Sequence, residues 1–371
     1  MKNNINFDEL KNIAQQFNFD GDITSVDPWG NGHINDTFVI KIITNNMPGK
    51  YILQKINKNV FTNPAEVMEN IEKITAHLKT KIAAYGGDVN RETLNIIPTK
   101  ENANYAIDSQ GDYWRVFAFI DHAISYEIIS NPNDFYNSAK AFGKFQKLLA
   151  DFPADTLHET IPNFHHTISR YETFLEAVKN DKMGRAKDVQ SDIQFVIDRK
   201  QDTETLLHML EAGELPLRVT HNDTKINNVM VDESTGEGIC VIDLDTVMPG
   251  LSLYDFGDSI RSGATSGLED EPDLSKIWME LPLFEIYTKG FMESVGDALT
   301  ENEVLMLPMG AKVMTFECGI RFLTDHLNGD TYFKIHREGH NLDRARTQFK
   351  LVSDMEAKWS EMMGIVKSYI N

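Results

Sequence analysis

The feature that most constrains this chain is a set of polar residues lying between apolar, strand-like segments within residues 215–261. It begins with five consecutive residues, which are His221, Asn222, Asp223, Thr224 and Lys225. Asn228 follows Asp223 after five positions, and the apolar run 239–242 leads to Asp243, twenty positions after Asp223. A loop and a strand end that present polar groups in this order predict that these side chains meet in one crevice.

These residue types in this order fit phosphoryl transfer from ATP. Such a reaction requires the protein to position the acceptor hydroxyl and to hold the magnesium ion that neutralises the phosphates. We assign Asp223 as the base and Lys225 as a phosphate contact. We assign Asn228 and Asp243 as magnesium ligands. A lone His-x-Asp arises by chance and Asn228 alone fits a turn, but the complete spacing is much harder to obtain by chance.

A second motif in the same stretch resembles a metal site but is spaced wrongly. Asp255, Phe256 and Gly257 spell the metal-binding motif of protein kinases. They lie too far from Asp223, and they follow Pro249 and a loop instead of a buried strand. We therefore expect Asp255 to be a helix N-cap or a brace for the catalytic loop.

Length and charge limit the partners of the chain. At 371 residues it exceeds one typical domain, so we expect two lobes that share a cleft. The formal net charge of −20 argues against nucleic acid and against an anionic membrane surface. It is compatible with ATP, which arrives with magnesium. The sequence has no run of about eighteen apolar residues and no apolar signal-peptide core near its start, so we expect a cytoplasmic protein.

The first third of the chain is rich in strand-like segments. Gly30, Asn31 and Gly32 precede one of them and predict a turn whose bare backbone amides can hold phosphate oxygens. The next strand, 51–56, presents Gln54 and Lys55 to opposite faces, and the sequence leaves open which of the two faces the phosphates. Asn63, Pro64 and Glu66 then predict a helix that starts with a capping box.

Short strands continue to about residue 120, where we expect a hinge in which Phe117 or Phe119 packs on the adenine ring. Beyond residue 133 the apolar spacing is helical, and helices are expected at 170–179, 192–211, 283–295 and 301–327. The last of these should begin with a capping box of Thr300 and Glu303. Arg321 lies within the last of these and needs a partner, which is either a structural carboxylate or a polar ligand. The two histidines at 165–166 fit a loop or surface role better than a metal site.

Several strings together carry a family resemblance. They read GNGHINDTF, YILQKIN, LRVTHNDTKINNVM, VIDLDTVMPG, YDFGDSIR and ECGIRFL. With them, the chain resembles the aminoglycoside phosphotransferase and choline kinase-like family. The resemblance implies an α+β, protein-kinase-like fold, with a small β-rich lobe at 1–121 that binds nucleotide and a larger, mostly helical lobe at 122–371. Over about residues 20–356 the strings are most similar to bacterial sugar 1-kinases that act on N-acetylhexosamines.

The resemblance implies a reaction and a set of contacts. The expected reaction is phosphorylation of the anomeric C1 hydroxyl of N-acetylglucosamine or N-acetylgalactosamine by ATP with Mg²⁺, in a monomer or weak homo-oligomer. The resemblance supports Asp223, Asn228 and Asp243 in the roles above, and the nucleotide contacts are expected at Gly30, Asn31, Gly32, Gln54 and Phe119. Sugar contacts are implied for His33, Arg321 and Tyr332, beside Asp223. Two alternatives remain: a kinase of another sugar, amino alcohol or aminoglycoside, and a sensor without catalysis.

Overall fold

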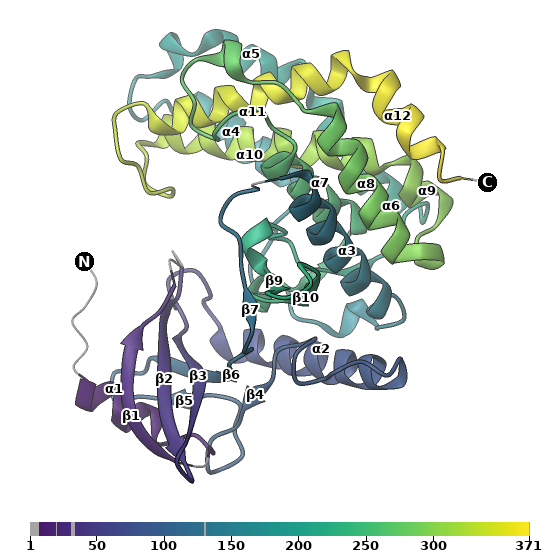
Figure 1. Cartoon of the computed structure of the whole chain (residues 1–371). Helices are drawn as coiled ribbons and strands as arrows, with labels where there is room; N and C mark the ends of the chain where they lie inside the picture. Colours follow the sequence, from purple (N-terminus) through teal and green to yellow (C-terminus); the bar gives the residue numbers. More distant parts are fainter. Residues whose placement is uncertain (1–6, 20, 31–33, 130, 371) are drawn as a thin grey trace.

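The structure is a computed structural model that describes residues 7–19, 21–30, 34–129 and 131–370. Figure 1 shows a small sheet-rich lobe and a larger helical lobe, joined through a single stretch of chain. The strands are β1 (Asp22–Pro28), β2 (Asp36–Thr44), β3 (Met47–Lys55), β4 (Ile96–Ile97), β5 (Ala106–Ile107), β6 (Tyr113–Ala118), β7 (Ala123–Ile124), β8 (Arg218–Thr220), β9 (Val229–Asp232), β10 (Gly238–Val241) and β11 (Met248–Gly250).

The helices lie mainly in the larger lobe. They are α1 (Phe7–Ala14), α2 (Pro64–Ala84), α3 (Pro132–Leu148), α4 (Thr167–Asn180), α5 (Gln190–Ile197), α6 (Lys200–Glu211), α7 (Ser252–Gly263), α8 (Leu281–Val295), α9 (Glu301–Leu305), α10 (Leu307–Asn328), α11 (His340–Ala357) and α12 (Trp359–Lys367). This arrangement confirms the expected α+β, protein-kinase-like fold with its small antiparallel sheet and helical remainder.

The N-terminal sheet is antiparallel, in the order β1-β2-β3-β6-β4, with β5 paired to β6. Its register sorts side chains between two faces, since alternate residues of a strand point to opposite sides. Leu53 of β3 lies opposite Val116 of β6, and both pack in the core that includes α1. The neighbouring pair, Gln54 and Arg115, therefore points to the other face, toward α2 and the larger lobe.

Helix α2 lies between the sheet and the helical lobe (Figure 1). One apolar cluster contains α2 residues such as Ile71 and Ile74, the α3 residue Phe142, and Val219 and Val247 of the larger lobe. The two lobes therefore share a continuous hydrophobic core around α2. The boundary expected at 121/122 falls in the turn between β6 and β7.

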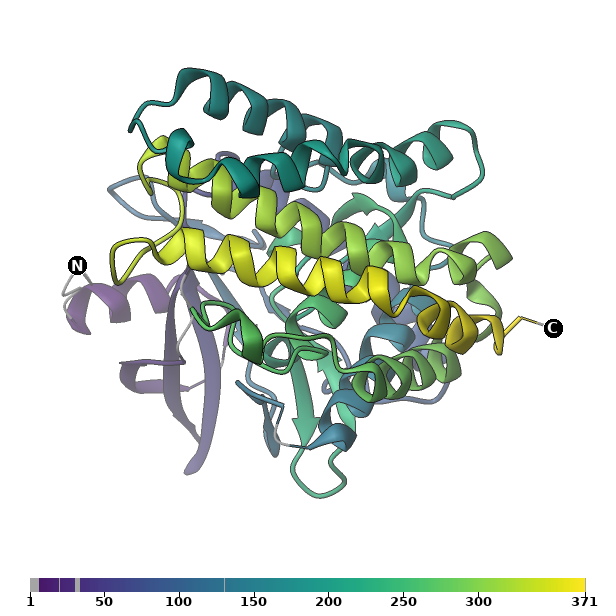
Figure 2. The ribbon, with the colours of Figure 1, turned by 90° about the horizontal axis from the view of Figure 1, so that it is seen from above.

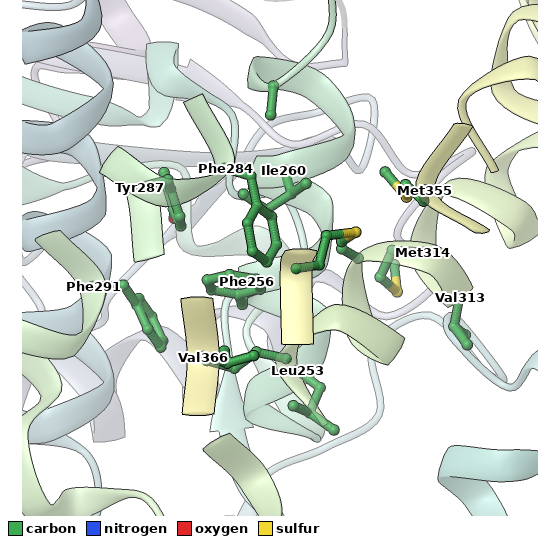
Figure 3. Close-up of a cluster of buried hydrophobic side chains, with 14 of the residues drawn as sticks. Leu253, Phe256, Ile260, Phe284, Tyr287, Phe291, Val313, Met314, Met355 and Val366 are labelled. Atoms are coloured by element: carbon green, nitrogen blue, oxygen red, sulfur yellow. The ribbon is translucent and has the colours of Figure 1, made fainter. Parts of the chain in front are cut away.

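The helical lobe is built around α10. Figure 2 shows α10 and α11, in yellow-green and yellow, side by side across this lobe. Beneath them Phe256 of α7 packs against the α8 rings of Phe284, Tyr287 and Phe291, at centroid distances of 5.9, 5.6 and 5.5 Å (Figure 3). Aromatic contacts of this kind hold α7 firmly on the core, and α7 in turn contacts the catalytic loop.

Three local predictions were wrong in detail. The helix expected at 192–211 is divided into α5 and α6. The helix expected at 301–327 is divided at Met306, because Pro308 has no N–H to continue the preceding helix and instead starts α10. Asn63 precedes α2, with a proline at its start as expected, but its side chain makes no capping hydrogen bond. The capping box of Thr300 and Glu303 is confirmed.

Within the described ranges, none of the helices combines the length and the apolar character that crossing a membrane requires.

Candidate active site

The catalytic loop connects β8 to β9 and brings two of the predicted residues into direct contact. The Nδ2 atom of Asn228 donates to the carbonyl oxygen of Asp223 at 2.8 Å and to its carboxylate at 3.2 Å. Ile242, at the end of β10, donates its N–H to the carbonyl of Asn228 at 2.9 Å. The carbonyl oxygen of Ile242 lies 2.8 Å from Nε2 of His221. Asp243, the next residue, therefore lies beside the loop that carries Asp223 and Asn228.

Two residues at this site have left-handed backbone conformations. The φ angles are 65° for Asn222 and 58° for Asp243. Such angles are unfavourable for residues other than glycine, although Asn and Asp tolerate them best. Asn222 is held there by its Nδ2, which donates to the carbonyls of Thr220 at 3.2 Å and Thr246 at 2.8 Å. The surrounding structure thus maintains a sharp turn directly before the predicted base, and a second one occurs at Asp243, after β10.

Helix α7 braces the catalytic loop through its buried carboxylates. Asp255 accepts the backbone N–H groups of His221 at 2.9 Å and Asn222 at 2.8 Å. Asp258, one turn on, accepts the N–H of Thr224 at 3.0 Å. Burial raises the pKa of Asp255, although its hydrogen bonds act in the opposite direction. The prediction that Asp255 braces the loop is confirmed. The N-cap alternative was wrong, because Leu251 is the cap and Asp255 lies in the first turn.

Negative charge accumulates where the loop meets β10. Asp243 has an exposed face, yet the surrounding protein and the charges of Asp245 and Asp223 raise its pKa to about 6. Nζ of Lys225 lies 2.7 Å from Asp223. Burial would lower the pKa of Lys225, but the carboxylates of Asp223 and Asp258 outweigh this and raise it. A cation placed near Asp243 would relieve the repulsion that raises its pKa.

Asn228 and Asp243 can hold magnesium if a bound nucleotide supplies further ligands. Among the residues that the structure describes, no three His, Cys, Asp or Glu side chains form a metal-binding group. Magnesium at a nucleotide site needs only one or two protein oxygens, with phosphates and waters completing its shell. The amide nitrogen of Asn228 faces Asp223, which leaves its Oδ1 free, and the carboxylate of Asp243 makes no hydrogen bond to a described residue. This donor set fits magnesium.

The predicted nucleotide contacts are only partly described. Gly30 has φ of 71° and open space around it, whereas Asn31, Gly32 and His33 lie outside the described residues. Phe119 is half-buried, 5.8 Å from the ring of Trp29 and 4.4 Å from Nζ of Lys50. Phe117 is 5% exposed and belongs to the core, so of the two aromatic residues Phe119 is the accessible one.

Gln54 and Lys55 have different environments. Gln54 points toward the larger lobe, where its Oε1 accepts two hydrogen bonds from Arg115 at 3.0 and 2.8 Å. Lys55 pairs with Asp112 and lies over the ring of Trp114 at 5.7 Å. Of these two side chains, Gln54 therefore faces the larger lobe, and the positive charge beside it belongs to Arg115.

A second polar cluster lies on the other side of the catalytic loop, around Arg321. The Arg321 guanidinium lies over the rings of Phe164, Tyr332 and Phe333, at 5.5, 5.9 and 5.4 Å from their centroids. Its nearest carboxylate is that of Glu317, 4.0 Å away, and it makes no hydrogen bond to any described residue. Its side chain is 18% exposed, whereas Tyr332 is 68% exposed. Arg321 thus has hydrogen-bond donors available in a largely enclosed place.

His165 connects this cluster to the catalytic loop. Its Nδ1 lies 3.0 Å from Glu317, and its Nε2 lies 3.4 Å from the carbonyl of Asn222. Burial would raise the pKa of Glu317, but His165 and Arg321 outweigh it and lower the pKa. The expected loop position of His165 is confirmed, since it lies in the turn before α4, but its side chain is only 7% exposed and is not at the surface. The exposed His166 caps α4.

Several charged residues around the catalytic loop and around Arg321 were not predicted from the sequence. They are Arg115, Arg170, Asp245, Asp258 and Glu317. The available signal was a charged residue inside an apolar segment, such as Arg115 in WRVFA, because a buried charge requires a partner. The partner itself is not readable from the local pattern.

Comparison with known proteins places these features in context. A sequence profile described as the phosphotransferase enzyme family matches residues 28–277. A microcompartment-associated aminopropanol kinase is similar in structure, with TM-score 0.61, 14% identity, and coverage of 95% of this chain and 97% of the other. An amicoumacin kinase, in complex with AMP-PNP, Ca²⁺ and Ami, has a TM-score of 0.56 and 14% identity, with coverage of 94% of this chain and 92% of the other. A choline kinase from Cryptosporidium parvum has a TM-score of 0.57 and 14% identity, with coverage of 94% of this chain and 93% of the other. At such low identities these likenesses show the fold.

Proposed function

Because the chain belongs to the phosphotransferase enzyme family, we propose that it is a sugar kinase of the N-acetylhexosamine 1-kinase type. It transfers the γ-phosphoryl group of ATP to the anomeric C1 hydroxyl of N-acetylglucosamine or N-acetylgalactosamine, producing the sugar 1-phosphate and ADP. Residues 1–121 form the nucleotide-binding lobe, and residues 122–371 carry the catalytic loop and the sugar site. The amicoumacin kinase structure, with a nucleotide analogue and a divalent cation, supports a nucleotide–metal complex as donor.

The residues of the catalytic loop have distinct tasks in this proposal. Asp223 orients the C1 hydroxyl and accepts its proton as the bond to phosphorus forms. An anomeric hydroxyl is more acidic than an ordinary alcohol, so a carboxylate can serve as base. Lys225, 2.7 Å from Asp223, is close enough to contact the transferred phosphoryl group. When bound by Asn228 and Asp243, magnesium supplies further neutralisation of the phosphate charge.

The acceptor is proposed to be neutral because of the charges around Arg321. Arg170 donates two hydrogen bonds to the carbonyl of Phe164, at 3.3 and 2.9 Å, and Arg321 lies over the ring of the same residue, so two guanidinium groups surround Phe164. The nearest carboxylate to Arg321, Glu317, is engaged by His165 through Oε1, and its Oε2 has no hydrogen-bond partner among the described residues. A cationic acceptor would be repelled here, whereas the carbonyl of an acetamido group and sugar hydroxyls can accept hydrogen bonds from Arg321.

The observation that carries the proposal is the guanidinium of Arg321, held among aromatic rings without a hydrogen bond to a described residue. It also weighs against the alternative of an amino alcohol or choline acceptor. Such cations are bound by aromatic rings. Here the rings of Phe164, Tyr332 and Phe333 already surround a cation that belongs to the protein.

The test is the identity of the product. The enzyme is incubated with ATP, Mg²⁺ and N-acetylglucosamine or N-acetylgalactosamine, and the product is analysed by mass spectrometry and phosphorus NMR. We expect a sugar monophosphate whose phosphorus couples to the anomeric proton. The methyl glycoside of the same sugar, which has no free C1 hydroxyl, is the control and should give no product. Phosphorylation of choline, aminopropanol or an aminoglycoside in preference to the sugars would overturn the proposal.

A further inference from the structure

One buried carboxylate joins the metal-binding turn to the small lobe. Asp245 lies two residues after Asp243, in the turn Leu244–Thr246, and is 3% exposed. Its Oδ1 lies 2.5 Å from Nη1 of Arg115, a contact that is an ion pair and not an aligned hydrogen bond. Its Oδ2 accepts a hydrogen bond from Nδ2 of Asn35 at 2.6 Å. Asp245 belongs to the larger lobe, whereas both partners belong to the smaller one.

The first partner, Arg115, is fixed on the sheet. It lies on β6 opposite Gln54 of β3 and is 1% exposed. Its Nε and Nη2 donate to Oε1 of Gln54 at 3.0 and 2.8 Å, and its guanidinium lies 5.1 Å from the ring of Phe117. Gln54 lies on β3, the strand that carries a phosphate-binding lysine in protein kinases, and it faces the larger lobe. In this chain the neighbouring strand supplies the cation, and Gln54 holds it in place.

The second partner, Asn35, fixes one end of the glycine-containing loop. It directly precedes β2, and its Oδ1 accepts the backbone N–H of Asn57 at 3.0 Å. The side chain of Asn57 also donates to the carbonyl of Ile34 at 3.0 Å. Asp245 therefore contacts both the sheet and the segment that leads out of the loop predicted to hold the phosphates.

Both oxygens of Asp245 are engaged by the smaller lobe, so this carboxylate is not free to bind metal. We propose that Asp245, Arg115, Gln54 and Asn35 form an inter-lobe clamp that sets the position of Asp243 relative to the nucleotide loop. Arg115 is thus a positioning residue for the magnesium–nucleotide complex. It supplies from β6 the positive charge that a lysine on β3 would supply. The clamp rests on the proposed function only in that Asp243 binds the metal–nucleotide complex, and it applies to any acceptor.

A structural role and a positioning role can be separated by how a buried ion pair responds to mutation. Removing one partner leaves a buried charge and is strongly destabilising, whereas replacing both partners with apolar residues of similar size is often neutral for stability. A double variant can therefore regain stability without regaining the connection between the lobes.

The experiment compares Asp245→Asn, Arg115→Met, and the double variant Arg115→Met with Asp245→Leu. The Tm of each is measured with and without AMP-PNP and Mg²⁺, and the Kd of the complex is measured by calorimetry. Arg218→Met serves as control, because Arg218 pairs with the buried Glu303 at 2.8 Å in an ion pair of the larger lobe that contains none of the proposed site residues. No acceptor is present, so the result does not depend on which substrate is phosphorylated.

We expect the single variants to have a lower Tm and the double variant to recover much of it. All three should bind Mg²⁺–AMP-PNP about ten- to a hundred-fold more weakly, since mutating the groups that hold a metal ligand in position typically costs this much metal affinity. The control should have a lower Tm and an unchanged Kd. Wild-type affinity in the double variant, or in Asp245→Asn, would overturn the clamp. Absence of a sugar phosphate with intact nucleotide binding would instead contradict the proposed acceptor.

Discussion

The side chains of Asn228 and Asp223 are joined by a hydrogen bond of 3.2 Å, in which the amide nitrogen donates to the carboxylate. The same nitrogen donates to the carbonyl of Asp223 at 2.8 Å. Both contacts are to acceptors, so the nitrogen faces the predicted base and the amide oxygen faces away from it. One side chain thereby orients the base and presents an oxygen to a cation.

Replacing the base should abolish turnover without abolishing nucleotide binding. Asp223→Asn keeps the size of the side chain and removes its ability to accept a proton. We expect kcat to fall by about 10²- to 10⁴-fold, the contribution typical of a general base. The rise in Tm with AMP-PNP and Mg²⁺ should remain, which shows that the variant is folded. Turnover close to that of the wild type would refute this assignment.

Replacing Arg321 should affect the acceptor alone. Arg321→Lys keeps the charge and loses the planar guanidinium that lies over three rings. We expect the KM for the sugar to rise by roughly thirty-fold, which corresponds to about 2 kcal/mol for a hydrogen bond to a charged group. The KM for ATP should not change. Arg344→Lys is the matched control, because Arg344 is also 18% exposed and lies 5.4 Å from the ring of Phe322. Equal effects of both variants on the sugar KM would contradict the prediction.

The raised pKa of Asp243 predicts a dependence on pH. Its ordinary value is 3.8 and its folded value is about 6, because burial and the nearby carboxylates disfavour the charged form. Ionising Asp243 therefore destabilises the metal-free protein, by an amount that grows between these two pH values and is constant above them. In the absence of Mg²⁺ and at a pH above about 6, Asp243→Asn should have a higher Tm than the wild type. At a pH below 3.8 the substitution should have little effect on Tm.

The same variant should lose the stabilisation that Mg²⁺–AMP-PNP gives to the wild type. In the wild type, that stabilisation should decrease as the pH falls through about 6, because the protonated carboxyl does not bind metal. Thermal unfolding across this pH range, with and without the complex, measures both effects. A wild-type response that does not vary with pH would argue against Asp243 as a ligand.

Helix α7 should tolerate no side chain where it crosses α10. A Cβ at Gly257 would overlap the carbonyl of Gly310, and α7 carries the carboxylates that brace the catalytic loop. Gly257→Ala should lower stability by about 1–3 kcal/mol, as overpacking does, and should also reduce kcat. Gly364→Ala in α12 is the control, since a Cβ there meets nothing within 4 Å. It should stabilise by about 0.5–1 kcal/mol. Denaturant unfolding of both variants tests the pair.

Local spacing predicted which regions are strands and which are helices, whereas the partners of the buried charged residues were not predicted. The division into a strand-rich first third and a helical remainder followed from strands before residue 120 and helical spacing after 133, because each periodicity is a property of one segment. The protein-kinase-like fold itself was implied by the family resemblance. The capping box at Thr300 is a contact over three residues and was confirmed. The enclosed contact of the His165 side chain was not predicted because its partner, Glu317, lies 152 positions away. Pro308 divided one expected helix, and that signal was present in the sequence.

The sequence by itself determined the catalytic loop, since Asp223 and Asn228 are five positions apart on one turn and contact each other directly. It also determined that an apolar run leads to Asp243, two residues after β10 ends at Val241, because such a run must be buried and leaves its polar successor at the edge. Only the tertiary structure decided that Asp245 would pair with Arg115 and with Asn35, which is 210 positions away. Buried charges pair through space, and a chain pattern shows that a partner is needed without showing which residue it is.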